Sequence, residues 1–250
     1  MTDSQVVKET APSVEPPETS DSHEEAAQAK SSEAVEEGST SEETDSDEAV
    51  QDEAVADEIV AAKGPEVSGK LFTDLELPET LQSALKDMGY IHPTEVQLAT
   101  LEPGGAGKDL VVQAKTGSGK TTAFGIPIIA RLQENKAESC KPRAIALVPT
   151  RELAHQVANE LRELCEGSSL KVFAVYGGVS IGRQAGALKG GVDIVVGTPG
   201  RLLDHLRRKN MLLDDVEIMV LDEADEMLSM GFWDDVTGLL RDIPGEKQTM

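Results

Sequence analysis

The chain has 250 residues, of which 28% are charged and only 3% aromatic, and its formal net charge at pH 7 is −23. No run of about 18 apolar residues is present, which excludes a helix that spans a membrane. Two cysteines outside any metal or redox spacing indicate reduced thiols, and the acidic N-terminus argues against a secretory signal, so we expect a soluble, cytoplasmic protein.

Residues 1–69 are predicted to be a disordered acidic tail. They contain twenty acidic and three basic residues, so they carry 17 of the 23 net negative charges, and they lack Leu, Phe, Tyr and Trp. A segment so poor in large apolar side chains cannot bury enough surface to offset the entropy of ordering its backbone. Alanine and glutamate in residues 47–63 favour transient helix there.

Residues 70–98 are predicted to be a segment that precedes the main domain, which we place at residues 99–250. The stretch "GYIHPTEVQ" ends at Gln97, whose amide both donates and accepts hydrogen bonds and so suits N6 and N7 of adenine. Phe72 lies 17 positions before Gly89, and its ring could stack on the base. Taken alone, Gln97 is more typical of a helix surface and Phe72 of a core anchor.

Short apolar runs alternate with helical patterns along the main domain. The runs span residues 109–114, 143–150, 171–178, 192–199 and 216–225. Strands that are apolar on both faces and separated by helices predict an α/β fold, a parallel sheet with helices on both faces and right-handed crossovers. One such helix is predicted from apolar residues at helical spacing, namely Leu153, Val157, Leu161 and Leu164. Because each run ends in a polar or glycine-containing signature, these signatures should meet at the carboxyl edge of the sheet, where ligands bind.

The first signature, "AKTGSGKT", follows a strand and opens a helix, as a phosphate-binding loop does. Gly117 and Gly119 let successive backbone N–H groups point at phosphate oxygens, and the N-terminus of the helix adds partial positive charge. Lys120 would reach the β- and γ-phosphates, and the Thr121 hydroxyl would bind Mg²⁺. The alanine that replaces the usual first glycine costs little where φ is negative. The alternative is a glycine-rich turn with a chance lysine.

The signature "VLDEAD" places carboxylates at the end of another apolar strand. Asp222 is positioned to hold Mg²⁺, through water, opposite Thr121, and Glu223 could accept a proton from the attacking water. Alone, such a cluster is more typical of a solvated loop. A phosphate-binding loop at the same edge of the sheet favours the catalytic interpretation.

Three further signatures, "PTREL" (149–153), "GG" (177–178) and "TPGR" (198–201), offer hydroxyls, arginines and bare backbone. These groups suit a sugar–phosphate backbone, which proteins bind without reading its sequence. Each motif alone is also typical of an ordinary strand-to-helix turn.

Several other residues are given structural interpretations. His92, His155 and His205 lack metal-ligand spacing and are expected at the surface or with protein partners. Trp233 is predicted to be a packing anchor rather than a platform for a base. Residues 206–209, "LRRK", are expected to end a helix and to complement its dipole.

From Phe72 to its end the chain resembles the DEAD-box ATP-dependent RNA helicases, with seven signatures in the family's order: the isolated Phe, the Q motif, the phosphate-binding loop, PTREL, GG, TPGR and DEAD. The resemblance implies a RecA-like domain of a two-domain motor, in which ATP and RNA bind across the cleft between the domains. It implies an enzyme that uses ATP and Mg²⁺ to remodel short RNA duplexes and RNA–protein contacts. An alanine at the first position of the phosphate-binding loop is usual in this family.

The resemblance also implies roles for individual residues. Lys120, Asp222 and Glu223 would be catalytic, Thr121 and Asp222 would hold the metal, and Asp225 would couple the site to a downstream Ser-Ala-Thr motif. ATP would be bound by Phe72, Gln97, Ala114, Thr116, Gly117, Ser118, Gly119, Lys120, Thr121 and Thr122. RNA would be bound by Thr150, Arg151, Gly178, Thr198 and Arg201.

The sequence stops where that family continues into Ser-Ala-Thr and a second domain. We therefore expect a monomeric ATP-binding half that binds adenine nucleotide weakly, is nearly inactive in ATP hydrolysis and does not unwind RNA alone. Two alternatives are another phosphate-loop ATPase or GTPase, although no Asn-Lys-x-Asp guanine motif is present, and a non-catalytic nucleotide- or RNA-binding module. The acidic tail could aid solubility, or it could mimic RNA or dock a basic partner.

Overall fold

The computed structural model describes residues 58–61, 68–135 and 140–250. Contacts divide the chain into residues 1–51 and residues 52–250, and every described residue belongs to the second unit. Most of the predicted acidic tail therefore lies outside the described residues.

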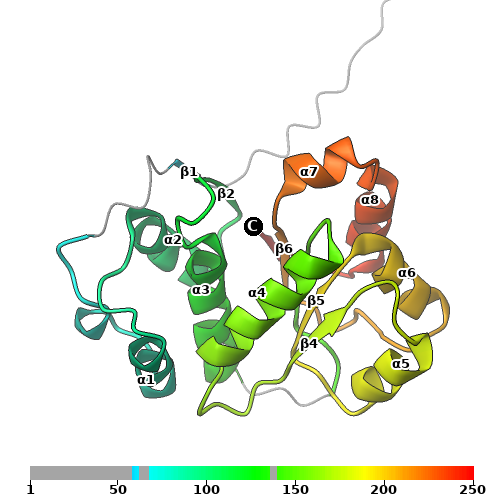
Figure 1. Ribbon diagram of the computed structural model, residues 1–250, viewed down its shortest axis with the longest axis horizontal. Coiled ribbons are helices and arrows are strands. Elements are labelled where there is room, and N and C mark those ends of the chain that lie inside the picture. Colours follow the sequence, from blue (N-terminus) through cyan, green and yellow to red (C-terminus); the bar gives the residue numbers. More distant parts are fainter. Residues whose placement is uncertain (1–57, 62–67, 136–139) are drawn as a thin grey trace, which may run out of the picture. The chain divides into compact units, whose positions relative to one another are not determined.

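A parallel five-stranded sheet forms the centre of this unit (Figure 1). The order of its strands is β4-β5-β3-β6-β7, and every pairing is parallel. The strands are β3 (Ala144–Leu147), β4 (Val172–Val175), β5 (Ile194–Gly197), β6 (Ile218–Leu221) and β7 (Gln248–Thr249). The first four lie within apolar runs identified in the sequence, so the predicted parallel sheet is confirmed.

The first apolar run forms β2 (Leu110–Gln113), which pairs in parallel with β1 (Glu58–Ala61) in a separate two-stranded sheet. The backbone N–H of Thr249 donates to the Asp109 carboxylate at 2.6 Å, which links the start of β2 to β7. Residues 58–61, which lie within the predicted acidic tail and within the stretch 47–63 expected to form transient helix, form the strand β1. Backbone pairing with β2 orders them, and composition gives no sign of such pairing.

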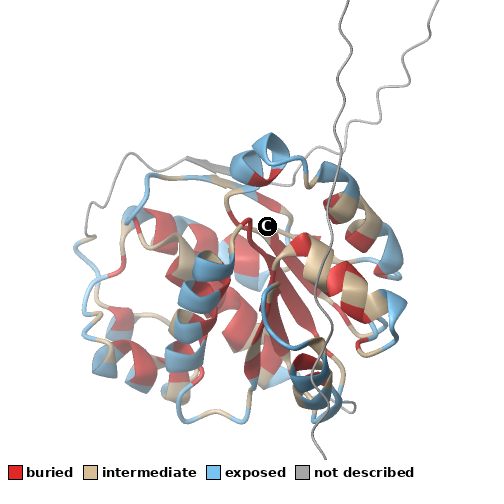
Figure 2. Ribbon diagram, turned by 45° about the vertical axis from the view of Figure 1, so that its right-hand side comes forward, coloured by how far each residue is buried: buried red, intermediate tan, exposed pale blue. Residues whose placement is uncertain are grey.

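Helices cover both faces of the sheet (Figures 1 and 2). Along β3, Ala144 and Ala146 pack into one core cluster, whereas Ile145 and Leu147 pack into the other. The first cluster is built with residues of α1, α3 and α4, and the second with residues of α5, α6, α7 and α8. The strands read as continuous apolar runs because both of their faces are buried.

The helical elements are η1 (Phe72–Asp74), α1 (Glu79–Asp87), α2 (Glu95–Gly105), α3 (Lys120–Glu134), α4 (Arg151–Leu164), α5 (Ile181–Lys189), α6 (Pro199–Arg207), α7 (Ala224–Ser229) and α8 (Trp233–Asp242). The helix predicted from apolar spacing is α4, and its residues Val157, Leu161 and Leu164 are fully buried. Residues 206–209 include the end of α6, as predicted.

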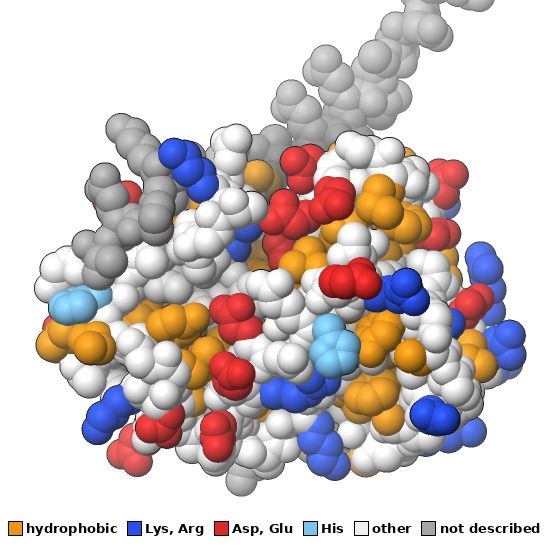
Figure 3. Space-filling model, viewed as in Figure 1, with side chains coloured by type: hydrophobic (Ala, Val, Ile, Leu, Met, Phe, Trp, Pro, Cys, Tyr) orange, Lys and Arg blue, Asp and Glu red, His pale blue; other side chains and the backbone are white. Residues whose placement is uncertain are grey.

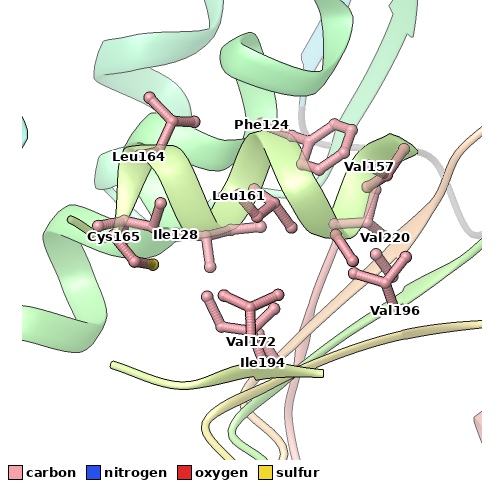
Figure 4. Packing of buried hydrophobic residues seen from close by; sticks show 14 of the residues in the cluster. Phe124, Ile128, Val157, Leu161, Leu164, Cys165, Val172, Ile194, Val196 and Val220 are labelled. Atoms are coloured by element: carbon pink, nitrogen blue, oxygen red, sulfur yellow. The ribbon is translucent and has the colours of Figure 1, made fainter. Parts of the chain in front are cut away.

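Helix α4 packs closely on α3, the helix that begins at the phosphate-binding loop (Figure 4). Gly125 of α3 makes this approach possible, because a Cβ atom there would lie 2.8 Å from Leu161 Cδ2 and 3.0 Å from Leu164 Cδ1. The helices that follow β2 and β3 are thereby held against each other.

Candidate functional site

The strands of the main sheet end level with one another at the carboxyl edge. Leu147 at the end of β3 pairs with Gly197 of β5 on one side and with Leu221 of β6 on the other, and Gly197 pairs with Val175 of β4. The segments that follow these four strands contain PTREL, TPGR, DEAD and GG. These four signatures therefore meet at one edge of the sheet, as predicted, whereas the fifth, the phosphate-binding loop, follows β2, which pairs in the separate two-stranded sheet.

The phosphate-binding loop lies between β2 and α3, and its glycines have the backbone geometry that the loop requires. Gly117 and Gly119 have φ of 77° and 85°, and Gly119 is the N-cap of α3. The Ser118 hydroxyl is buried and has no hydrogen-bond partner among the described residues. A left-handed turn at a helix N-terminus with an unsatisfied buried hydroxyl has the properties of an anion cradle.

The segment that precedes the domain, residues 70–98, makes hydrogen bonds to the backbone of this loop. The Thr94 hydroxyl donates to the carbonyl of Ser118 at 3.0 Å, and the Gln97 amide donates to the carbonyl of Gly119 at 3.4 Å. The other end of the amide accepts from the N–H of Thr94 at 2.8 Å, and Gln97 is only 4% exposed. In this conformation Gln97 contacts the phosphate-binding loop, and its burial leaves little access for a base.

Phe72 is in the core and not in a base pocket. It is 3% exposed and belongs to the same cluster as residues of α1, α3 and α4. This matches the interpretation of Phe72 as a core anchor. The ring presents no open face here, so stacking on adenine would require this segment to open.

Lys120 and Glu223 join the phosphate-binding loop to the DEAD signature. The Lys120 ammonium donates to the Glu223 carboxylate at 2.7 Å. Glu223 has φ of 56°, a left-handed conformation that is uncommon for a residue other than glycine, and such strain of about 1–3 kcal/mol is typical of functional sites. The sequence alone predicted both residues for one site, and the structure brings them into contact.

Asp222 lies at the end of β6 with little access to water. It is 9% exposed, and its backbone N–H donates to the carbonyl of Leu147. Burial, followed by the neighbouring charge of Glu223, raises the pKa of the Asp222 carboxyl to about 6, while Lys120 opposes this rise. Asp222 is therefore a carboxylate that would gain from a nearby cation.

The raised pKa of Asp222 predicts a pH dependence of Mg²⁺-dependent nucleotide binding. Because the folded pKa of about 6 exceeds the ordinary value of 3.8, the folded protein holds the proton more tightly, so this group's contribution to stability falls as pH rises between those values. A proton competes with the metal, and affinity should fall up to tenfold per pH unit below about 6. Calorimetric titrations with MgATP at several pH values on both sides of about 6 would measure this change in affinity.

The nucleotide's own phosphates also titrate near this pH, so Asp222→Asn is the matched control. Its remaining pH dependence reports the nucleotide alone. Equal pH profiles for the two proteins would contradict a role for the Asp222 proton.

The oxygen donors at this edge fit a magnesium ion. Thr121 supplies a partly exposed hydroxyl and Asp222 a carboxylate, which are hard ligands of the kind Mg²⁺ takes. Among the described residues no three His, Cys, Asp or Glu side chains gather into a metal site. Few protein ligands suit Mg²⁺, which keeps several waters and shares its coordination with phosphates.

Thr122 and Glu160 form a contact that the sequence did not predict. The hydroxyl of Thr122, a fully buried residue of α3, donates to the carboxylate of Glu160 on α4 at 2.7 Å. Thr122 was predicted to bind nucleotide, and in this structure its hydroxyl contacts Glu160. Glu160 also adds to the rise in the pKa of Asp222. No signal in the sequence separates Glu160 from the other acidic residues on the polar face of its helix.

Lys120, Asp222 and Glu223 open onto a cavity of about 660 Å³ between β2 and β6. Residues of both strands line it, together with Ala114, which was predicted to border the nucleotide. Acidic side chains gather where α7 begins (Figure 3). Thr116 is exposed in the same loop.

The candidate RNA-facing residues meet at the loop that contains the two glycines. Gly178 has φ of 84°, and a Cβ atom there would overlap the guanidinium of Arg151. Arg201 donates to the carbonyl of the next residue, Val179, at 2.9 Å. Thr150 and Thr198 are the N-caps of α4 and α6. Three signatures far apart in the sequence thus form one surface around this loop.

The remaining predicted residues are placed as follows. Asp225 is exposed in the first turn of α7. Trp233 is 52% exposed, so its prediction as a packing anchor is wrong: the start of α8 leaves much of the indole in solvent. The histidines have partners, as predicted: His92 contacts the Lys70 carbonyl, and His155 packs against the Tyr176 ring.

Comparisons with known proteins agree with this geometry. A family model described as DEAD/DEAH box helicase matches residues 94–250. The DEAD-box ATP-dependent RNA helicase CshA of Bacillus licheniformis is 48% identical over 179 residues, which cover 72% of this chain and 36% of the relative. The ATP-dependent RNA helicase CshA of Listeria monocytogenes is 47% identical over 179 residues, 72% of this chain and 34% of its own length.

A solved structure of a DEAD box protein from the hyperthermophile Methanococcus jannaschii aligns with a TM-score of 0.67 and 42% identity, over 72% of this chain and 48% of that chain. The chain spans about a third of the length of the curated relatives it matches. In the described part of the chain, no helix combines the length and apolarity needed to cross a membrane.

Proposed function

Because this chain belongs to the DEAD/DEAH box helicase family, we propose that it forms the ATP-binding, RNA-facing part of an RNA helicase. In this role it couples ATP binding and hydrolysis to local remodelling of RNA duplexes or RNA–protein contacts. We also propose a cytoplasmic location, with which the free thiols of Cys140 and Cys165 are compatible.

The contact between Lys120 and Glu223 carries this proposal. It joins the loop that follows β2 to the acidic signature that follows β6, at a distance of 2.7 Å. The two residues are 103 positions apart in the sequence. A glycine-rich turn without a function would not be expected to bring its lysine into contact with the acidic residue of another signature. A phosphate-binding cation and a candidate base in one cavity support ATP hydrolysis over simple RNA binding.

The chemistry follows from the positions of these side chains. Lys120 would exchange Glu223 for the β- and γ-phosphates, and Glu223 would then be free to take a proton from the attacking water. Thr121 and Asp222 would hold Mg²⁺, which when bound neutralises charge on the phosphates. The backbone of residues 117–119 would bind the phosphate oxygens through its N–H groups.

The adenine-selecting roles proposed for Gln97 and Phe72 need a rearrangement of both residues. The structure supports a different task for Gln97, which is to hold Gly119 in place. Nucleotide binding would then be sensitive to Gln97 through the shape of the phosphate-binding loop as well as through the base.

A single-turnover hydrolysis assay with radiolabelled ATP, with and without single-stranded RNA, tests the proposal on the chain as it is. We expect hydrolysis that depends on Mg²⁺ and is lost in Glu223→Gln, with ATP binding retained. Retained hydrolysis in this variant would contradict the assignment of the base. ATP binding without hydrolysis under either condition would favour a non-catalytic nucleotide- and RNA-binding module.

A further inference from the structure

Gln184 of α5 is a buried polar residue to which none of the sequence signatures refers. It is 4% exposed, and its amide makes three hydrogen bonds. The amide nitrogen donates to the carbonyl of Tyr176 at 3.1 Å, and the amide oxygen accepts from Arg201 at 2.9 Å and from His205 at 3.0 Å. One side chain thus joins the strand end before the double glycine to the arginine of TPGR.

His205 fixes the orientation of the Gln184 amide. The imidazole is fully buried, and its Nδ1 accepts from the side-chain amide of Asn210 at 3.3 Å, so Nε2 carries the proton and donates to Gln184. Burial, followed by the charge of Arg201, lowers the pKa of His205, so the ring is neutral near pH 7. The Gln184 oxygen therefore faces two donors and cannot exchange places with its nitrogen without losing both bonds.

The amide oxygen in turn holds Arg201 in a single orientation. Nη1 of Arg201 donates both to Gln184 and to the carbonyl of Val179, each at 2.9 Å. These two bonds use one nitrogen of the guanidinium and leave Nε and Nη2 for another acceptor. A planar guanidinium fixed in this way presents two parallel N–H donors, the geometry that binds a phosphate in a bidentate manner.

We infer that Gln184 is a positioning residue for RNA: supported by His205, it holds Arg201 ready for a backbone phosphate and ties it to the double-glycine loop. This inference rests on the proposed function, because it needs Arg201 to contact RNA. Gln184 itself touches no RNA in this account.

A double-mutant cycle on the 250-residue chain tests the inference. The probe is a short fluorescently labelled oligouridine at low salt, and the variants are Gln184→Leu, Arg201→Ala and the combination. Loss of a charge-assisted bond predicts that Arg201→Ala weakens RNA binding roughly tenfold, and Gln184→Leu should lose most of the same factor. If Gln184 acts through Arg201, the combined variant binds no more weakly than Arg201→Ala.

The salt dependence supplies a readout that a general loss of stability does not change. Each single variant should reduce the slope of log affinity against log salt by roughly one, the value for one lost phosphate contact. ATP affinity should remain unchanged, since neither residue borders the nucleotide cavity.

Gln248 provides the matched control. It is also 4% exposed, its amide nitrogen donates to the carbonyls of Gly104 and Lys108, and its amide oxygen accepts from Arg131. Gln248→Leu should lower the melting temperature about as much as Gln184→Leu and leave RNA affinity and the salt slope unchanged.

The outcomes separate the two levels of the proposal. Additive losses in the cycle, or an unchanged salt slope in Gln184→Leu, would overturn the positioning role and leave the proposed function standing. Absence of RNA binding by the unmodified chain at low salt would overturn the proposed function and this inference with it.

Discussion

Replacing Lys120 by alanine is expected to abolish ATP binding. Lys120 is the cation that would contact the β- and γ-phosphates, and charge-assisted bonds of this kind contribute about 1.5–3 kcal/mol each, so two of them correspond to at least a hundredfold in affinity. A second effect adds to the first. Lys120 holds down the pKa of Asp222, so its loss would leave that carboxyl more protonated and less able to hold Mg²⁺.

Isothermal titration calorimetry with MgATP measures this loss, and Lys115→Ala is the matched control. Lys115 carries the same charge in the same loop and is exposed. If position rather than local charge decides affinity, Lys115→Ala should bind ATP within a few-fold of the unmodified chain. Unchanged titration of Lys120→Ala would remove the basis for a nucleotide site at this loop.

Replacing Gly119 by alanine is expected to disrupt the phosphate-binding loop itself. At φ of 85° an alanine costs about 1–2 kcal/mol, and its Cβ atom would overlap the amide of Gln97. Gln97 cannot simply move aside, because it is buried and holds Thr94 and Gly119. We expect a loss of stability larger than the conformational cost alone and, since the N–H groups of the loop would shift, a loss of ATP binding.

Gly89→Ala is the control that measures the conformational cost of alanine at positive φ without a steric overlap. Gly89 has φ of 78°, and no atom lies within 4 Å of the position that a Cβ atom would take. Urea unfolding of both variants separates the two contributions. In a Gln97→Ala background the destabilisation caused by Gly119→Ala should fall to about that of Gly89→Ala, because the overlapping amide is gone. Equal destabilisation in both backgrounds would show that Gln97 does not restrict this position.

The fold could be predicted from the sequence because its strands are buried on both faces. The runs 143–150 and 216–225 contain the segments AIAL and IMVL, which are apolar on both faces as in a parallel sheet covered by helices, and these segments form β3 and β6. The phosphate-binding loop and the acidic signature could be assigned for the same reason, since both follow such runs. Their positions after apolar runs predicted that Lys120 and Glu223 belong to one site, although β2, which precedes the phosphate-binding loop, pairs with β1 and not with the main sheet.

Contacts that depend on tertiary packing could not be predicted. Glu160 and Gln184 lie on helices whose sequences mark them only as polar positions, and their partners come from other elements of the chain. The contacts that Gln97 makes with Thr94 and Gly119 could not be predicted either, because a buried amide satisfies the nearest backbone groups and these become its neighbours only in the fold. Trp233 was predicted to be buried and is exposed, because the size of an apolar side chain does not establish that it is buried.

The central position of β3 sets the distance over which the two halves of the site can influence each other. Leu147 at its end pairs with β5, which leads to Arg201, and with β6, which leads to Asp222. Neighbouring strands lie about 5 Å apart, so about one nanometre separates the chain leading to Arg201 from the chain leading to Asp222. A small molecule bound at the end of β3 would therefore border both signatures at once.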